Sequence, residues 1–308
     1  MALLYKADPV RGAEWKAIIA ARKPDLPVHV WPDTGDADAV RYLAVWVPPD
    51  NMAARFPHVK IVFSIGAGVD QFDLSTLPAH IPVVRMLDPG IAEGMLEYVT
   101  LAVLALHRNL VEYIADKSAE RWSAIRLVPA QRRRVGILGL GQLGEAAFRK
   151  LAGFGFAMSG WSRSPRTIDG ISCRAGMDAL PDFVGSCDIL VCMLPLTEQT
   201  RGILNADLFQ KMPRGAALVN AGRGGHLQQE DLLAALDAGH LSGAFLDVTD
   251  PEPLPRGHPL WAHPRVILTP HVASMTRPET AVDFVLETIA RHEAGLPLRG
   301  LVDRTRGY

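Results

Sequence analysis

Three polar residues of the sequence, Arg223, Glu252 and His271, are of the types that act on a carbonyl group. Each follows an apolar run expected to form a strand, at 216–220, 244–248 and 266–268. The carboxyl ends of parallel strands form the ligand crevice of an open α/β sheet, so we expect the three side chains to face one site. Histidine can deliver a proton near neutral pH, a neighbouring carboxylate orients it, and a guanidinium grips carboxylate and carbonyl oxygens with planar donors.

A glycine-rich segment, Gly139-Leu140-Gly141-Gln142-Leu143-Gly144, directly follows the apolar run 135–138 and precedes a helical pattern. The first glycine permits a tight turn, the second lets the backbone approach a pyrophosphate, and the third lets helix and strand touch. The helix N-terminus adds free N–H groups and a positive dipole. Other glycine turns can imitate this hexapeptide, but the strand before it and the helix after it favour a dinucleotide site.

The next apolar run ends in Gly160-Trp161-Ser162-Arg163-Ser164. NAD-binding sheets place an acidic residue here, ~20 residues after the glycines, to hold the ribose 2′-hydroxyl. No carboxylate is present, whereas Arg163 and the hydroxyls of Ser162 and Ser164 could bind a 2′-phosphate. The segment therefore predicts NADPH, with a solvated arginine as the alternative.

A second possible anion site lies in the N-terminal part, at Ser64-Ile65-Gly66-Ala67-Gly68-Val69-Asp70. Glycines tolerate the turn that would point the N–H groups of Ala67, Gly68 and Val69 at a carboxylate. The alternative is that Gly66 and Gly68 serve only a turn.

The elements that must position these residues fall into two series. Short apolar runs alternate with helical segments over 3–84 and again over 135–268, which indicates two parallel sheets covered by helices. Between them, 93–114 predicts one long helix that is apolar on most faces and hence buried. The apolar spacing of 279–292 predicts a further helix that packs back on the first series.

Composition limits the function classes. The 308 residues carry 32 Lys and Arg against 33 Asp and Glu, so no global cationic field favours nucleic acid. Three cysteines, an odd number, argue against a disulfide framework, and the N-terminus lacks the apolar core of an export signal. The apolar tract 95–106 is shorter than the ~18–20 residues that span a bilayer. We expect a cytoplasmic protein without membrane or nucleic-acid partners, and without a metal, because His258 and His263 lack metal-site spacing.

Together the motifs resemble the D-2-hydroxyacid dehydrogenase family, and most of all its glyoxylate/hydroxypyruvate reductase A branch. The resemblance is carried by 64–70, the glycine loop, Leu194-Pro195-Leu196-Thr197 with Thr200, the Arg223 motif, 247–253 and Thr269-Pro270-His271. It implies two doubly wound α/β domains of parallel strands with a cleft between them: a flavodoxin-like substrate domain, 1–96 and 276–308, and a Rossmann-type NADP(H)-binding domain, 97–275. It also implies NADPH as cofactor and a homodimer formed through the long linking helix.

The resemblance assigns roles residue by residue. Asp247 would bind the nicotinamide carboxamide, although it could instead cap a turn, and Trp46 would close the substrate pocket, although a core tryptophan is nearly as plausible. The substrate set is Trp46, Ala67, Gly68, Val69, Arg223 and His271. The cofactor set is Gly139, Gly141, Gln142, Leu143, Gly144, Ser162, Arg163, Ser164, Leu194, Pro195, Thr200, Ala221, Gly222, Arg223, Asp247, His271 and Ala273.

The sequence thus predicts NADPH-dependent reduction of glyoxylate to glycolate and of hydroxypyruvate to D-glycerate, with His271 as general acid and Glu252 and Arg223 beside it. Two alternatives stay open. The first is the same chemistry on bulkier 2-oxo acids such as phenylpyruvate. The second is a nucleotide-sensing scaffold, because the family also contains a transcriptional corepressor.

Overall fold

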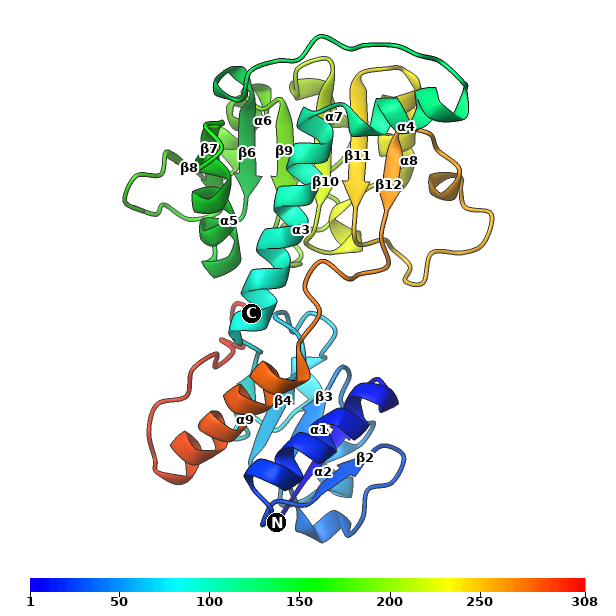
Figure 1. Cartoon of the computed structure of the whole chain (residues 1–308). Helices are drawn as coiled ribbons and strands as arrows, with labels where there is room; N and C mark the ends of the chain where they lie inside the picture. Colours follow the sequence, from blue (N-terminus) through cyan, green and yellow to red (C-terminus); the bar gives the residue numbers. More distant parts are fainter. Residues whose placement is uncertain (308) are drawn as a thin grey trace. The chain divides into compact units, whose positions relative to one another are not determined.

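The computed structural model describes residues 1–307, which divide into two compact units (Figure 1). Unit 1 comprises Met1–Glu93 and the segment from Met275 onward, and unit 2 comprises Gly94–Ser274. The chain passes from unit 1 to unit 2 after Glu93 and returns after Ser274, and the domain boundaries predicted from the sequence lie after residues 96 and 275. Each unit has its own sheet.

The sheet of unit 1 is entirely parallel, with the strand order β2-β1-β3-β4-β5. This 2-1-3-4-5 order is the flavodoxin-like form of a doubly wound sheet. The strands are β1 (Ala2–Lys6), β2 (Val28–Val30), β3 (Val40–Val45), β4 (Ile61–Ser64) and β5 (Val83–Val84). Strands β1, β3 and β4 are almost wholly buried, as expected where both faces of a parallel sheet are covered.

Helices α1 (Pro9–Arg22), α2 (Met52–Arg55) and α9 (Pro278–Glu293) belong to unit 1. Helix α1 begins after Asp8, whose carboxylate caps it by accepting hydrogen bonds from the Val10 and Arg11 N–H groups. Helices α1 and α9 pack side by side and share an ion pair between Arg22 and Asp283.

The C-terminal tail is tied into unit 1. Leu301 forms an antiparallel bridge with Val84, and the Val302 N–H donates to the Val83 carbonyl at 2.9 Å. The Arg304 guanidinium donates to four backbone carbonyls of the loop before β5, those of Leu74, Leu77, Pro78 and Ile81. A planar fork of donors suits this arrangement better than a lysine would.

Unit 2 contains a seven-stranded parallel sheet in the order β12-β11-β10-β9-β6-β7-β8. The strands are β6 (Arg134–Leu138), β7 (Ala157–Ser162), β8 (Cys173–Ala175), β9 (Ile189–Cys192), β10 (Ala216–Asn220), β11 (Leu241–Leu246) and β12 (Val266–Leu268). From β6 the chain adds β7 and β8 on one side of that strand, and it then continues with β9 on the opposite side of β6. The carboxyl ends of β6 and β9 are therefore the switch point where such sheets bind ligands.

Helices cover both faces of this sheet. Helices α3 (Pro89–His107) and α5 (Gln142–Ala152) contribute to one buried apolar cluster with Val135, Ile137 and Val219. Helices α6 (Leu180–Gly185), α7 (Ala206–Lys211) and α8 (Gln229–Asp237) contribute to the opposite cluster with Trp161 and Leu218. The sheet is thus buried between two apolar cores, and its parallel strands present their carboxyl ends on one edge.

The single helix predicted for 93–114 is wrong in two respects. Asn109 has φ 57°, which ends α3, and α4 (Leu110–Ser118) begins after it. Leu101, Leu110 and Ile114 are exposed, so the segment is not buried all round. Within the described chain, α3 has the length and apolar composition of a membrane span, yet half of that window is buried inside the protein, as in a core helix.

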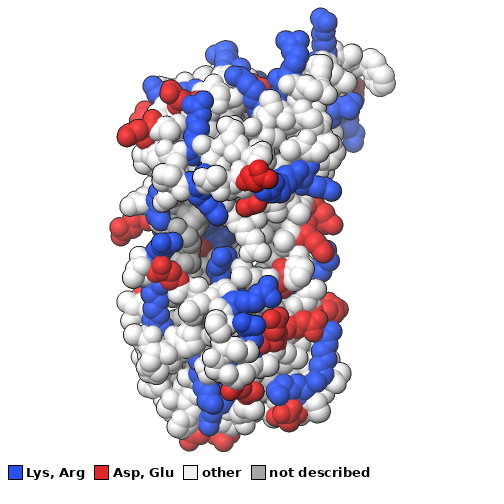
Figure 2. All heavy atoms as spheres, turned by 90° about the vertical axis from the view of Figure 1, so that its left-hand side faces the viewer, with Lys and Arg blue, Asp and Glu red and all other residues white. Residues whose placement is uncertain are grey.

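Charged side chains of both signs are intermixed over the face drawn in Figure 2. Ion pairs of the described chain include Arg149 with Glu145 and Arg134 with Asp188. This distribution accompanies the near balance of acidic and basic residues in the sequence.

Candidate active site

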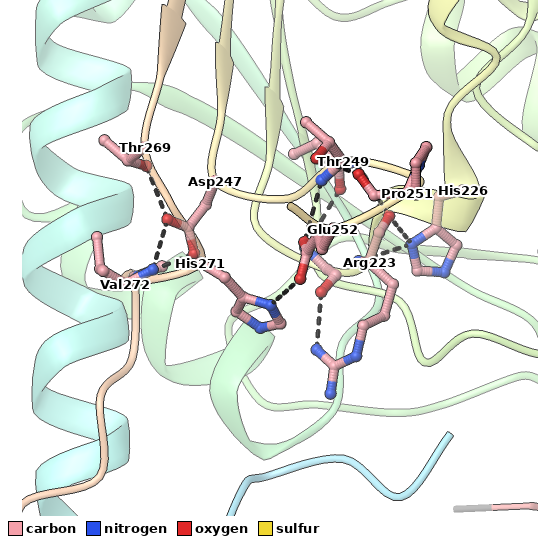
Figure 3. A network of polar contacts seen from close by, with 12 residues as sticks. Arg223, His226, Asp247, Thr249, Pro251, Glu252, Thr269, His271 and Val272 are labelled. Carbon is pink, nitrogen blue, oxygen red and sulfur yellow. Dashed lines mark hydrogen bonds and ion pairs between the residues drawn. The ribbon is translucent and has the colours of Figure 1, made fainter. Parts of the chain in front are cut away.

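Arg223, Glu252 and His271 follow β10, β11 and β12, which are neighbours in the sheet of unit 2. Figure 3 shows the His271 ring pointing toward the Glu252 carboxylate, with the Arg223 side chain extending from the neighbouring loop. The structure therefore brings the three predicted side chains to the same edge of one sheet.

A short hydrogen bond joins His271 to Glu252, with His271 Nδ1 2.8 Å from Glu252 Oε2. The other carboxylate oxygen, Oε1, accepts the Thr249 N–H at 3.1 Å, so both oxygens of Glu252 are fixed. Burial alone would raise the pKa of Glu252, but the hydrogen bond and charge of His271, the Thr249 N–H and the charge of Arg223 outweigh it and lower the pKa. Glu252 is therefore held as a carboxylate against the imidazole.

The His271 backbone lies in the left-handed region, with φ 54°, which is strained for a residue with a side chain. The buried Asp247 carboxylate holds this turn: Oδ1 accepts the Thr269 hydroxyl and the Val272 N–H, and Oδ2 accepts the Ala273 N–H, all within 2.7–2.9 Å. The His271 N–H donates to the Asp247 carbonyl at 2.7 Å. Asp247 thus binds the chain around His271, in addition to any role at the cofactor.

The turn that carries Arg223 is also fixed by hydrogen bonds and by close main-chain packing. The fully buried Asn220 donates to the Arg223 carbonyl at 3.1 Å and accepts the Gly222 N–H at 3.2 Å. A Cβ atom on Gly224 would lie 1.8 Å from the Thr249 carbonyl oxygen. Only glycine fits there, so the Arg223 turn and the loop that carries Glu252 are in direct backbone contact.

The glycine loop has the geometry that its sequence predicts. Gly139 has φ 99°, and a Cβ on Gly144 would lie 1.8 Å from the Gly139 carbonyl oxygen, so neither position accepts a side chain. A Cβ on Gly141 would meet nothing within 4 Å. Helix α5 begins directly after Gly141 without a side-chain cap, so the N–H groups of its first turn, at Gln142, Leu143 and Gly144, have no acceptor within the helix. This arrangement fits a pyrophosphate.

A cavity of about 380 Å³ lies beyond the end of β7 and is lined by Trp161, Arg163, Met177, Gln199 and Thr200. It has no acidic lining residue, and Arg163 Nη1 donates to Gln199 Oε1 at 3.1 Å. The Ser162 hydroxyl donates to the Ser164 carbonyl at 2.7 Å, which shapes this turn. A ligand in this cavity would meet the Arg163 guanidinium, the Gln199 amide and the Thr200 hydroxyl.

The loop after β9 meets the glycine loop, because a Cβ on Gly139 would lie 2.7 Å from the Met193 carbonyl oxygen and 3.0 Å from the Leu194 nitrogen. Thr200 is buried, and its hydroxyl donates to the Pro195 carbonyl at 2.8 Å while accepting the Thr197 N–H at 2.9 Å. The predicted residues Leu194, Pro195 and Thr200 thus form one closed loop at the switch point. Ala221, Gly222 and Ala273 lie on the same edge of the sheet, after β10 and β12.

In unit 1, three backbone carbonyls of the loop after β4 accept hydrogen bonds from other parts of the same unit. The Gly66 carbonyl accepts the Met86 N–H, the Ala67 carbonyl lies 3.5 Å from Arg85 Nη1, and the Gly68 carbonyl accepts the Ser64 hydroxyl at 2.7 Å. A trans peptide points its N–H opposite to its carbonyl. The N–H groups of Ala67, Gly68 and Val69 consequently face the other way, and none of them donates a hydrogen bond within residues 1–307.

Trp46 follows β3 and is about two-fifths exposed. Its ring lies over the same loop, since a Cβ on Gly66 would be 3.2 Å from Trp46 Cζ3. The structure therefore places Trp46 beside the predicted anion cradle instead of in the core of unit 1.

Three residues near these sites carry contacts that the sequence did not reveal. His226 is fully buried beside Arg223, Arg85 lies behind the Ala67 carbonyl, and the Arg166 guanidinium donates to the Leu140 carbonyl of the glycine loop. Only Arg166 had a signal in the sequence, because it follows Arg163 closely after β7. No group of three potential metal ligands converges in the part of the chain that the structure describes.

Comparison with known proteins assigns the chain to a family. Residues 100–273 match the family profile of the D-isomer specific 2-hydroxyacid dehydrogenase NAD-binding domain. The glyoxylate/hydroxypyruvate reductase A of Yersinia enterocolitica is 42% identical over 301 residues, which cover 96% of each protein. The chain belongs to the D-isomer specific 2-hydroxyacid dehydrogenases.

Solved structures agree with this family over the full length of the dehydrogenase. A D-isomer specific 2-hydroxyacid dehydrogenase from Xanthobacter autotrophicus Py2, in complex with NADPH and MES, is 42% identical with a TM-score of 0.93 and covers 100% of this chain and 99% of its own. The NADPH-dependent glyoxylate/hydroxypyruvate reductase of Sinorhizobium meliloti, in complex with NADP and sulfate, is 38% identical with a TM-score of 0.92 and covers 100% and 99%. Both the family and its glyoxylate/hydroxypyruvate reductase A branch are thereby supported for this dehydrogenase, as its motifs predicted.

Proposed function

We propose that this dehydrogenase uses NADPH to reduce small 2-oxo acids, converting glyoxylate to glycolate and hydroxypyruvate to D-glycerate. The observation that carries the proposal is the His271–Glu252 hydrogen bond of 2.8 Å, with Arg223 on the adjacent loop. The names of relatives that share 38–42% of its sequence support the same substrates.

His271 is the general acid of this proposal. When a 2-oxo acid is reduced, its carbonyl oxygen becomes an alkoxide that must take a proton, and the imidazole supplies it, an effect of ~10²–10⁴-fold. The Glu252 carboxylate orients the ring through Nδ1, and Nε2 is the nitrogen proposed to give its proton to the substrate. Arg223 donates to the carbonyl and carboxylate oxygens, which fixes the ketone and stabilises its developing charge.

The described residues fit NADPH, which when bound supplies the hydride for the carbonyl carbon. The N-terminus of α5 and the open space at Gly141 suit the pyrophosphate. Arg163, with Ser162 and Ser164, suits the 2′-phosphate, and the lack of a carboxylate in the adjoining cavity disfavours an unphosphorylated ribose. Leu194, Pro195 and Thr200 form the neighbouring wall.

Unit 1 is proposed to bind the substrate carboxylate and unit 2 the cofactor. The three unpaired N–H groups of Ala67, Gly68 and Val69 are suitable donors for a carboxylate. Trp46, lying over Gly66, limits the room beside them and so favours short 2-oxo acids.

A substrate panel tests this proposal. The kcat/KM values of NADPH oxidation are compared for glyoxylate, hydroxypyruvate, pyruvate and phenylpyruvate, and the two short acids are expected to lead. A preference for phenylpyruvate would replace the small-substrate assignment by the bulkier one. Tight NADPH binding with no oxidation by any acid would favour the nucleotide-sensing scaffold.

We further propose that the protein is a cytoplasmic homodimer. Exposed apolar side chains gather on α3, α4 and the segment after them: Leu101, Leu110, Ile114, Trp122 and Leu127. A contiguous exposed apolar patch marks an association surface, and these side chains are proposed to form one. Sedimentation equilibrium is expected to give twice the chain mass, and Leu110→Asp with Ile114→Asp is expected to give the monomer.

A further inference from the structure

One buried titratable group beside the proposed active site has no part in the reaction described above. His226 lies in the short 3₁₀ turn Gly224–His226 after Arg223, and its side chain is fully excluded from solvent. A buried imidazole must find partners for both ring nitrogens or lose free energy. Its partners show what it does.

The two ring nitrogens contact two different loops. His226 Nδ1 lies 3.0 Å from the Arg223 backbone nitrogen, and Nε2 lies 3.3 Å from the Pro195 carbonyl oxygen (Figure 3 labels Arg223 and His226). The ring therefore bridges the turn that carries Arg223 and the loop after β9. A Cβ on Gly222 would lie 3.0 Å from Nδ1, so the ring is packed against the main chain at Gly222.

The hydrogen-bond partners determine the tautomer. The Arg223 N–H needs an acceptor, which Nδ1 can be only without a proton. Nε2 faces the Pro195 carbonyl oxygen, which only accepts, so Nε2 can bond to it only with a proton. The nearby Arg223 carbonyl, 3.1 Å from Nδ1, already accepts from the Asn220 amide and from the His226 N–H. The neutral ring with its proton on Nε2 thus suits both of these contacts, whereas a proton on Nδ1 would oppose the Arg223 N–H.

The same two loops are also joined by their main chains. The Leu204 N–H donates to the His226 carbonyl at 2.8 Å, and the Gly202 N–H donates to the Gly225 carbonyl at 2.9 Å. The Thr200 hydroxyl shares the Pro195 carbonyl with His226. The His226 side chain adds a further connection, from the Pro195 carbonyl to the backbone N–H of Arg223.

We propose that His226 is a positioning residue: as the neutral Nε2–H tautomer it fixes the main chain of Arg223 against the Pro195 loop, and so aims the guanidinium. It does not touch the substrate in this proposal. The inference rests on the proposed function for its kinetic part, because Arg223 matters to turnover only if a 2-oxo acid binds there.

Three variants separate the two hydrogen bonds. His226→Asn keeps an acceptor near Nδ1 but cannot reach Pro195, His226→Gln reaches toward Pro195 with an amide, and His226→Leu removes both bonds at similar volume. His240→Leu is the matched control, since His240 also donates to a carbonyl of unit 2, that of Phe209 at 2.7 Å, but lies away from Arg223.

Two measurements need no turnover. Nitrogen-15 NMR of the full-length protein at neutral pH should show the His226 ring, assigned by its loss in His226→Gln, as the Nε2–H tautomer. Hydrogen exchange of the 221–227 segment should be faster in His226→Leu by ~10-fold or more, and restored toward wild type in His226→Asn. A proton on Nδ1, or unchanged exchange in His226→Leu, would overturn the proposal.

The third measurement is kinetic. With NADPH saturating, kcat/KM for glyoxylate should fall by ~10²-fold in His226→Leu, because small misplacements of a binding group have effects of this size. The dissociation constant of NADPH should change less than threefold, His226→Asn should recover part of kcat/KM, and His240→Leu should match wild type. Equal losses in glyoxylate and NADPH binding would indicate a general structural role and contradict positioning.

The outcomes of the two proposals can be told apart. If the wild-type protein reduces no 2-oxo acid, the proposed function fails, and the tautomer and the exchange rates still decide whether His226 fixes Arg223. If His226→Leu does not fold, the proposal is decided by the tautomer of wild-type His226 and by the exchange rates and kcat/KM of His226→Asn.

Discussion

The site at the sheet edge of unit 2 and the loop of unit 1 are built in different ways. In unit 2 the groups proposed to react are side chains held by other side chains, as His271 is by Glu252 and, through its turn, by Asp247. In unit 1 the groups offered to a ligand are backbone N–H groups, oriented because their partner carbonyls are bound from behind. Side-chain identity therefore controls the first region, and main-chain conformation controls the second.

The largest effect is expected for a substitution of His271, the proposed general acid of the unit 2 site. His271→Gln keeps a hydrogen-bonding amide but has no proton to give, so kcat for glyoxylate should fall by ~10²–10⁴-fold. Steady-state kinetics measures kcat, and fluorescence titration should show NADPH binding unchanged. A variant with nearly normal kcat would remove His271 from the role of acid.

The next effect concerns the cation at the β7 end. Arg163→Ser removes the only charged residue of the adjoining cavity, and a hydrogen bond to a charged group contributes ~1.5–3 kcal/mol. The ratio of kcat/KM for NADPH to that for NADH should fall by ~10–100-fold. Arg174→Ser, at an exposed position on β8, is the control and should leave the ratio unchanged. An unaltered ratio in Arg163→Ser would assign the arginine to solvent.

Asp247→Asn should lower the free energy of unfolding by ~1–3 kcal/mol. The carboxylate accepts three hydrogen bonds, and an amide would have to turn its N–H₂ toward a donor in a buried site. Urea denaturation measures the change. Asp237 is exposed and pairs with His263, so Asp237→Asn should stay within ~0.5 kcal/mol of wild type. Equal stability of both variants would show that the His271 turn does not depend on Asp247.

A smaller effect tests the main-chain region. Arg85 is half-buried without an acidic partner in residues 1–307, and burial lowers its pKa. Arg85→Met removes the donor behind the Ala67 carbonyl, so KM for glyoxylate should rise ~5–10-fold, the size of one hydrogen bond, with kcat changing less. Arg41→Met, which loses a bond to the Asp38 carbonyl elsewhere in unit 1, should leave KM unchanged. A fall in kcat with constant KM would contradict a role in binding.

The smallest effect is a pH dependence. Because the pKa of Glu252 is lowered in the folded protein, its carboxylate adds stability above the ordinary glutamic acid value of ~4.3, and this is lost as the pH falls through the lowered value. The difference in unfolding free energy between wild type and Glu252→Gln should be constant near neutral pH and shrink in acid. Urea denaturation across pH measures it. A difference that grows in acid would have the wrong sign for a carboxylate held against His271.

Local sequence patterns predicted the parts whose geometry is local. Gly139 has the left-handed turn and Gly144 the close main-chain contact that were expected of them, since each depends on a turn of a few residues. The placement of Arg223, Glu252 and His271 after three strands was also predictable, because parallel strands end at one edge. The helix at 93–114 was predicted wrongly, because an apolar pattern does not reveal the left-handed residue Asn109 that divides it.

The sequence by itself determined the residue types for proton donation and anion binding, and the strand ends on which they stand. Only the tertiary structure decided which groups hold them. Asp247 closes the His271 turn from 22 to 26 residues away, and His226 reaches Pro195 across 31 residues. Such contacts depend on how strands and loops pack, because hydrogen bonding acts over about 3 Å of space and is indifferent to distance along the chain.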